Sequence, residues 1–314
     1  MKQYFKIFDE PWDVLIILDA CRFDYFEKSY SDFLKGKLHK KVTCGTNTPE
    51  WRNNNFKDYY KDIVYISSNP YINGKSEVEG FDSKKHFVKV YDVWETHWDS
   101  KLGTVTPESV SDVTLQAVKE NPDKKLIVHY LQPHAPYLAL DAAYGFSEPK
   151  NNFNPFRFSN EPDKPSIRTR LLNYFIKHNR KFNFFSNHTE WYIAQLLKLP
   201  AQSPMDYARR NYGIKGLRDA YTKNLNLVLN EVAYLISNLD AKRKIIISAD
   251  HGELLGEKNW FSHPHNSNNP IVRNVPWFEV EEVVKHNIKR KDSVQNELAD
   301  QIDIANKLKD LGYM

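Results

Sequence analysis

Five continuous apolar runs predict the buried strands of a parallel sheet, because they lack the alternation of a strand with one wet face. They lie at residues 13–20, 62–67, 125–130, 244–248 and 275–280. In the fifth run, Pro276 favours an edge position or a strand start, since proline has no N–H to donate to a neighbouring strand.

Segments with helical periodicity separate these runs. Thr106 followed by Pro107 is typical of a helix N-cap with proline at the first helical position. Residues 217–236 and, near the C-terminus, 298–312 carry apolar side chains on one face at the 3.6-residue period. Alternating strands and helices predict an α/β fold, with a doubly wound, mostly parallel sheet flanked by helices.

Residues 138–214 interrupt this alternation and begin with a stretch rich in Asn, Pro and Phe. Two helices are predicted within it, at 167–177 and 189–197. A long excursion of this kind is uncommon unless it forms a lid, a binding element or a small subdomain. We therefore expect one domain over residues 1–314, with 138–214 as a lid or subdomain insertion. Its aromatic and basic side chains could hold an anionic sugar or nucleotide, or form a small helical core of their own.

Composition and net charge limit the classes of partner that we expect for this chain. The chain has 314 residues, with 44 Lys plus Arg against 40 Asp plus Glu. The resulting net charge of +4 gives little support for a nucleic-acid partner. The longest apolar run, Val14–Leu18, is far shorter than the ~20 residues of a membrane span, and no secretory signal is visible. These features predict a cytoplasmic protein without a membrane span, whose Cys21 and Cys44 stay reduced.

Chemistry-bearing motifs follow the predicted strands. Asp19 comes directly after the first run, His134 follows the third, and Asp250 with His251 follows the fourth. Thr48 lies in a separate loop, Gly-Thr-Asn-Thr-Pro-Glu-Trp, at a predicted helix start. Ligands of open α/β sheets bind outside the carboxyl ends of the strands, so we expect these side chains to converge. Carboxylate, imidazole and hydroxyl groups together suit a divalent cation such as Mn or Zn.

Each motif alone has a plainer interpretation. An Asp after a strand is more often a helix N-cap than a metal ligand, and a His-Pro pair is more often a loop than a catalyst. The Asp-His-Gly-Glu motif at 250–253 is more specific. Its adjacent Asp and His can face one cation, while Gly252 lets the backbone turn away sharply.

In combination, the motifs resemble those of the alkaline phosphatase and sulfatase superfamily, over about residues 12–281. The shared order is an Asp after the first strand, a Thr at a helix start, His-x-Pro-Tyr, Asp-His-Gly-Glu and a late His-Pro. The first motif, Asp-x-x-Arg-x-Asp, is similar to that of sulfatase-like members. The resemblance implies that Asp19, Thr48, Asp250 and His251 bind one divalent metal ion, which could be Mn, Zn or Ca. It also implies that Thr48 supplies the nucleophilic hydroxyl.

Two of these assignments have alternatives. Thr46 lies in the same loop as Thr48 and could supply the hydroxyl instead. His134 and His263 could bind oxygens of the transferred group or protonate the leaving alkoxide. His265, two residues further on, is the alternative to His263.

Departures from the superfamily pattern narrow the chemistry. The Cys-x-Pro-Ser-Arg motif of formylglycine sulfatases is absent. The Asp-x-x-x-His pair of two-metal members is also absent before His134, so we expect one metal ion rather than two.

Arg22 could contact an anionic oxygen or pair with Asp24.

The expected function is a metal-dependent hydrolase or transferase that acts on phosphate or sulfate esters through a Thr nucleophile. Its substrate would be an anionic small molecule, a glycan ester or a lipid head-group ester. One alternative is a sulfatase-like binding protein whose site has decayed. The other is an enzyme similar to metal-dependent phosphoglycerate mutases, which need a complete two-metal ligand set.

Overall fold

The computed structural model describes residues 4–140, 145–146, 174, 187–284 and 288. The helix predicted at 298–312, all but residue 174 of the helix predicted at 167–177, and most of the insertion expected at 138–214 lie outside these residues. The interpretation of that insertion as a lid or subdomain stays a prediction.

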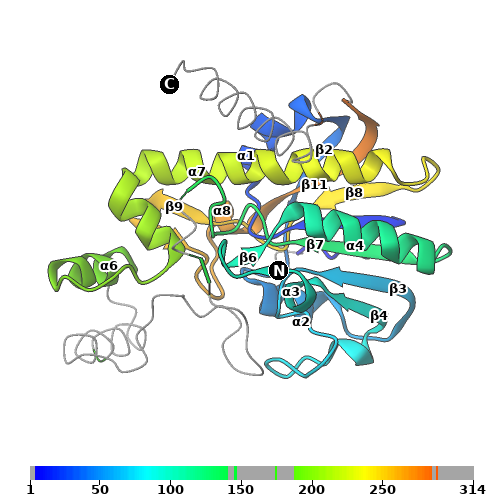
Figure 1. The fold of residues 1–314 in the computed structure, drawn as a ribbon, viewed down its shortest axis with the longest axis horizontal. Helices are drawn as coiled ribbons and strands as arrows, with labels where there is room; N and C mark the ends of the chain where they lie inside the picture. Colours follow the sequence, from blue (N-terminus) through cyan, green and yellow to red (C-terminus); the bar gives the residue numbers. More distant parts are fainter. Residues whose placement is uncertain (1–3, 141–144, 147–173, 175–186, 285–287, 289–314) are drawn as a thin grey trace, which may run out of the picture.

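A seven-stranded mixed sheet forms the centre of the fold, in the order β2-β11-β8-β1-β7-β3-β4 (Figure 1). Strands β8, β1, β7, β3 and β4 pair in parallel, whereas β11 runs antiparallel to both of its neighbours. The strands are β1 Val14–Leu18, β2 Leu34–Val42, β3 Tyr60–Ser67, β4 Phe87–Asp92, β7 Lys125–Tyr130, β8 Ile245–Ser248 and β11 Asn274–Val283. The predicted doubly wound, mostly parallel sheet is confirmed.

Helices and short strands surround this sheet. The α-helices are α1 Phe23–Ser29, α2 Thr48–Asn55, α3 Val93–Thr96, α4 Pro107–Glu120, α6 Asn187–Leu196, α7 Pro204–Ser237 and α8 Pro270–Arg273. Short 3-10 turns lie at Tyr30–Asp32 and Ser83–Lys85. Two small antiparallel ladders pair β5 Trp98–Asp99 with β6 Thr104–Val105, and β9 Leu254–Glu257 with β10 Trp260–Ser262. Among the described residues, no helix combines the length and apolar character that crossing a membrane requires.

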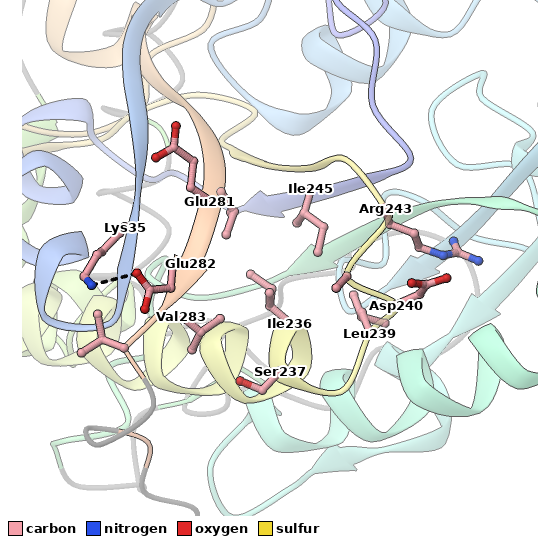
Figure 2. Close-up of a pocket in the computed structure, with 13 residues that line it drawn as sticks. Lys35, Ile236, Ser237, Leu239, Asp240, Arg243, Ile245, Glu281, Glu282 and Val283 are labelled. Carbon is pink, nitrogen blue, oxygen red and sulfur yellow. Dashed lines mark hydrogen bonds and ion pairs between the residues drawn. The ribbon is translucent and has the colours of Figure 1, made fainter.

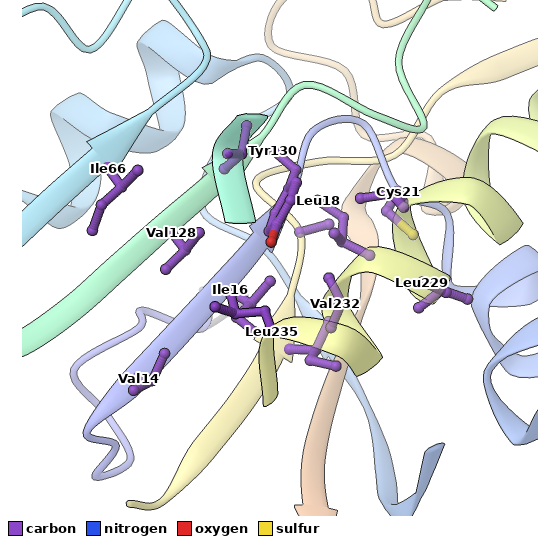
Figure 3. Close-up of a cluster of buried hydrophobic side chains, with 14 of the residues drawn as sticks. Val14, Ile16, Leu18, Cys21, Ile66, Val128, Tyr130, Leu229, Val232 and Leu235 are labelled. Atoms are coloured by element: carbon purple, nitrogen blue, oxygen red, sulfur yellow. The ribbon is translucent and has the colours of Figure 1, made fainter. Parts of the chain in front are cut away.

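Both faces of the central strand β1 are buried, which is why it reads as a continuous apolar run. On one face Ile16 packs into a core with Val232 of α7, shown in Figure 3, and with residues of α1 and α4. On the other face Ile17 packs into a second core with Trp51 of α2. The helices therefore cover the sheet from both sides.

Two strands of the seven-stranded sheet, β2 and β4, were not predicted, because they lie at its edges and contain many polar residues. The edge strand β2 reads Leu-Lys-Gly-Lys-Leu-His-Lys-Lys-Val and pairs its lysines with glutamates of β11, as in the Lys35–Glu282 ion pair at 2.8 Å. The edge position favoured for the strand containing Pro276 is wrong, since β11 lies between β2 and β8. Pro276 is the third residue of β11, and its ladder with β8 begins only at Trp277.

The predicted helix starts and stops are partly confirmed. Thr106 caps α4, accepting a hydrogen bond from the Ser109 amide. The helix predicted at 217–236 is longer than expected, because α7 begins at Pro204 with Ser203 as its N-cap. Gly213, at φ 67°, interrupts the helical backbone of α7 in a conformation that side chains disfavour.

A groove of about 830 Å³ lies at the edge where β8 begins and β11 ends (Figure 2). Its apolar lining includes Ile236 of α7, Ile245 of β8 and Val283 of β11, and the Lys35–Glu282 pair lies on its rim. Because β8 starts in this groove, the groove faces away from the motifs that follow the other end of β8.

Candidate metal centre and active site

The predicted site residues converge at one edge of the sheet. Strands β1, β3, β7 and β8 run in the same direction, so the segments that follow them meet there. Asp19 follows β1 directly, and Asp250 and His251 follow β8. Thr48 is the first residue of α2, whose N-cap Asn47 accepts a hydrogen bond from the Glu50 amide. Thr48 thus occupies the positive end of a helix.

Asp19, Asp250 and His251 form a buried cluster whose ligand atoms all lie within 4.8 Å of one another. His251 Nε2 is 3.3 Å from Asp250 Oδ2 and 3.8 Å from Asp19 Oδ1. The Thr48 hydroxyl donates to Asp250 Oδ2 at 2.7 Å. Three oxygen donors and one imidazole nitrogen therefore face one another, a set that Zn²⁺ and Mn²⁺ accept.

Hydrogen bonds orient the ligand atoms toward the centre of this cluster. His251 Nδ1 lies 3.0 Å from the Gly252 carbonyl, which can only accept, so Nδ1 carries the proton and Nε2 presents a lone pair. Asp250 Oδ1 accepts from the amides of Ala20 and His251, which leaves Oδ2 facing Thr48. This arrangement fits a cation ligand set.

The electrostatics also fit a cation. Burial, and then the charge of Asp250, raise the pKa of Asp19 well above its usual range. Burial alone would raise the pKa of Asp250 too, but His251, His129 and the Thr48 hydroxyl bring it below its usual value. Two carboxylates in this dry environment repel each other, and a divalent cation between them would remove that repulsion.

Sequence reasoning missed Asn69, which follows β3. Its side-chain amide donates to Asp19 Oδ2 at 2.6 Å and lies 3.2 Å from the Thr48 hydroxyl. The signal was available, because Asn69 follows a strand as Asp19 does, but a single Asn after a strand is commonplace. In the structure it links the candidate metal ligands to the candidate nucleophile.

A second cluster consists of His134, Glu253 and His263, with ligand atoms again within 4.8 Å. The β9–β10 ladder pairs Leu254 with Ser262, which brings the flanking Glu253 and His263 together. His134 Nε2 lies 4.0 Å from Glu253 Oε1, and burial raises the pKa of Glu253 to about 7. Glu253 Oε2 and His263 Nδ1 are buried without a hydrogen-bond partner, which indicates a site that binds a further group.

The two clusters adjoin, since the rings of His251 and His263 are 4.4 Å apart. Thr46 and His265, the alternatives to Thr48 and His263, have other partners. The Thr46 hydroxyl donates to Glu50 Oε2 at 2.8 Å rather than to the cluster. His265 is exposed and bonds Asn47 through Nδ1 at 2.8 Å.

Gly252 is needed for a different reason than expected. It does not adopt a left-handed backbone conformation. A Cβ atom there would lie 2.2 Å from the Ile271 carbonyl oxygen, and the Gly252 amide donates to the Val272 carbonyl at 2.7 Å. The close approach of α8 to the Asp-His-Gly-Glu segment therefore requires glycine.

Of the two roles open to Arg22, the structure shows the pairing with Asp24. Its buried guanidinium also bonds Glu257 Oε1 at 2.7 Å and the Glu253 carbonyl at 3.3 Å. These bonds tie the segment after β1 to the β9–β10 hairpin. Arg22 thus joins the segment that carries Asp19 to the hairpin that Glu253 and His263 flank.

We expect Glu257→Gln to lower the free energy of unfolding by about 1–3 kcal/mol at pH 7, since it weakens a charged bond to buried Arg22. Burial alone would raise the pKa of Glu257, but the bond from Arg22 brings it below its usual value. A lowered folded-state pKa stabilises the fold above the unfolded pKa of about 4.3, and this stabilisation is lost as the pH falls through the folded pKa. The difference between variant and wild type should therefore shrink in acid. Urea unfolding at several pH values measures it.

Glu282→Gln is the matched control, because its partner Lys35 is exposed and the pair lies in solvent. Its unfolding curve should overlay that of the wild type. Equal effects of the two substitutions, or a Glu257→Gln effect that does not shrink as the pH falls below the unfolded pKa of about 4.3, would contradict this account of Arg22.

The sheet, its flanking helices and the buried donor set at its carboxyl edge define an α/β protein with a candidate metal centre. By sequence, no protein-family model and no curated protein matches the chain. Solved structures align with most of the chain at low identity. They include the C-terminal periplasmic domain of EcEptC from Escherichia coli in complex with Zn, at 13% identity and TM-score 0.48, over 86% of this chain and 72% of that chain.

Two further solved structures, each of another protein, also align with the chain. The soluble domain of lipooligosaccharide phosphoethanolamine transferase A from Neisseria meningitidis has 15% identity and TM-score 0.45, over 84% of this chain and 75% of that one. Phosphonate monoester hydrolase SpPMH from Silicibacter pomeroyi has 14% identity and TM-score 0.43, over 86% and 68%. At this similarity the likeness assigns no activity or substrate to this chain.

Proposed function

We propose that the protein is a metal-dependent enzyme that transfers the acid group of a phosphate or sulfate ester to Thr48. The observation that carries this proposal is the buried Thr48 hydroxyl, which points at Asp250 Oδ2 from 2.7 Å within a ligand set completed by Asp19 and His251. A hydroxyl that only stabilised a helix start would face backbone amides. Here Asn47 caps the helix and leaves Thr48 to the site.

Asp19, Thr48, Asp250 and His251 would hold one divalent cation, which supplies charge neutralisation and lowers the pKa of the hydroxyl. Thr48 Oγ1, having lost its proton to solvent, would attack the phosphorus or sulfur atom, and the bond from that atom to the alcohol oxygen would break. Asn69 can donate to an oxygen of the transferred group, since its amide lies 3.2 Å from Oγ1. Water, or an acceptor hydroxyl in a transferase, finally displaces the group from Thr48.

His134 and His263 would protonate the departing alcohol or bind oxygens of the transferred group, as their adjoining position supports. The expectation of one metal ion stays a prediction. Glu253 supplies, from another part of the chain, the carboxylate that is missing before His134, so the second cluster could also take a cation.

The substrate we propose is an anionic small-molecule ester, a glycan ester or a lipid head-group ester. A cytoplasmic location stays a proposal as well. The convergence of Asp19, Thr48, Asp250 and His251 supports an intact site over a decayed binding protein.

The proposal is tested by removing bound metal with a chelator and measuring turnover before and after addition of Mn²⁺ or Zn²⁺. The panel would contain p-nitrophenyl phosphate, bis-p-nitrophenyl phosphate, a p-nitrophenyl phosphonate ester and p-nitrophenyl sulfate. We expect metal-restored hydrolysis of at least one ester. Failure of every ester with every divalent metal would overturn the proposal.

A further inference from the structure

Arg52, on α2 one turn after Thr48, is fully buried. Its guanidinium is bonded to two backbone carbonyls, those of Tyr71 and Val78, instead of to a carboxylate. The Arg52 Nε atom has no hydrogen-bond partner, and burial lowers the pKa of Arg52 to about 10. Burying a guanidinium that is bonded to carbonyls instead of a carboxylate costs folding free energy. This cost indicates that Arg52 has a specific role.

The guanidinium holds the loop that follows β3. The Tyr71 and Val78 carbonyls lie near the two ends of this loop, and Phe81 places its ring 4.9 Å below the Arg52 guanidinium carbon. Arg52 thus ties both ends of the loop to α2.

The same loop carries Asn69. The Tyr71 amide donates to Asn69 Oδ1 at 2.9 Å, which turns the Asn69 side-chain nitrogen toward Asp19 and Thr48. Tyr71 is therefore held by Arg52 through its carbonyl and holds Asn69 through its amide. Helix α2 therefore contacts Asn69 twice. The Thr48 hydroxyl does so directly, and Arg52 does so through Tyr71.

We propose that Arg52 is a positioning residue, which fixes the Asn69 amide between Asp19 and Thr48. The predicted effect on turnover rests on the proposed function. The contacts that join Arg52, Tyr71 and Asn69 do not. Without the two guanidinium bonds, Tyr71 can shift and the Asn69 amide moves with it. Misplaced Asn69 costs transition-state contacts, so kcat should fall while KM changes little.

A double-mutant cycle tests the effect on turnover. We expect Arg52→Lys to reduce kcat about tenfold and Asn69→Ala about 10–100-fold. The double variant should lose no more than Asn69→Ala alone, because Arg52 acts through Asn69. Effects that multiply would overturn the inference.

Arg243→Lys is the matched control, since Arg243 also bonds two loop carbonyls, those of Pro122 and Lys124, at the opposite edge of the sheet. It should leave kcat unchanged. If Arg52→Lys fails to fold, Phe81→Leu keeps an apolar side chain there but removes the ring under the guanidinium, and should lower kcat in the same direction.

A second measurement needs no activity, so it separates failure of the inference from failure of the proposed function. In protein labelled with ¹⁵N at asparagine, the Asn69 side-chain signal is the one missing from the Asn69→Ala spectrum. We expect Arg52→Lys or Phe81→Leu to shift this signal and Arg243→Lys to leave it in place. An unmoved Asn69 signal in a folded Arg52→Lys protein would overturn the inference, whether or not any ester is turned over.

Discussion

Asp250→Asn should remove bound metal and reduce ester turnover by about 10³-fold or more. Asp250 Oδ1 accepts the amides of Ala20 and His251, whereas Oδ2 faces Thr48 and the candidate cation position. Asparagine can keep both amide bonds through its own oxygen while replacing Oδ2 with a neutral NH₂ group. The fold should therefore survive. Loss of a metal ligand removes several kcal/mol of charge stabilisation, and each 1.4 kcal/mol is about tenfold in rate.

The measurement combines metal content after gel filtration with turnover of the ester that the wild type hydrolyses. Asp240→Asn is the control, because Asp240 lines the groove at the opposite edge of the sheet. It should retain metal and activity. Full metal content in Asp250→Asn would show that the cluster around Asp250 is not the metal site.

Thr48→Val should abolish turnover, by at least about 10³-fold, while Thr46→Val should cost less than about tenfold. Valine has the shape of threonine but no hydroxyl, so the two substitutions remove one oxygen each. The Thr48 oxygen faces Asp250, whereas the Thr46 hydroxyl only donates to Glu50. Glu50 would keep its bond from the Thr46 amide at 3.0 Å in the variant. Thermal melting shows whether both variants fold.

Thr48→Ser completes this set, since it retains a hydroxyl on a more mobile side chain and should keep part of the activity. Metal binding should persist in Thr48→Val, because Asp19, Asp250 and His251 remain. The opposite ranking, with Thr46→Val inactive and Thr48→Val active, would move the nucleophile to Thr46.

The central strands and the metal-ligand candidates could be predicted from sequence for the same physical reason. A strand covered on both faces must be apolar throughout, so β1, β7 and β8 are visible as runs. A polar residue that ends such a run, as Asp19 does, then lies at the carboxyl edge. The edge strands β2 and β4 bury little surface, so their polar sequences carry no comparable signal.

Partnerships between distant segments were harder to predict. Glu253 meets His263 because of the register of the β9–β10 ladder, whose two-residue turn, Lys258 and Asn259, has positive φ at both positions. That turn type favours Asn-Gly or Asp-Gly, so Lys-Asn gives a weak hairpin signal. Asn69 depends on bonds from Tyr71 and to Asp19 that only the folded chain brings together.

The central claim, that Thr48 is the nucleophile of a metal-dependent ester transfer, is tested most directly by mass spectrometry of the quenched enzyme. The metal-loaded protein would be mixed with the activated aryl ester that it turns over, quenched in acid within one turnover and digested. The account predicts that the transferred phosphoryl or sulfuryl group is found on Thr48, and that no such adduct forms after chelation. An adduct on another residue, or turnover with no adduct on the protein at any quench time, would contradict it.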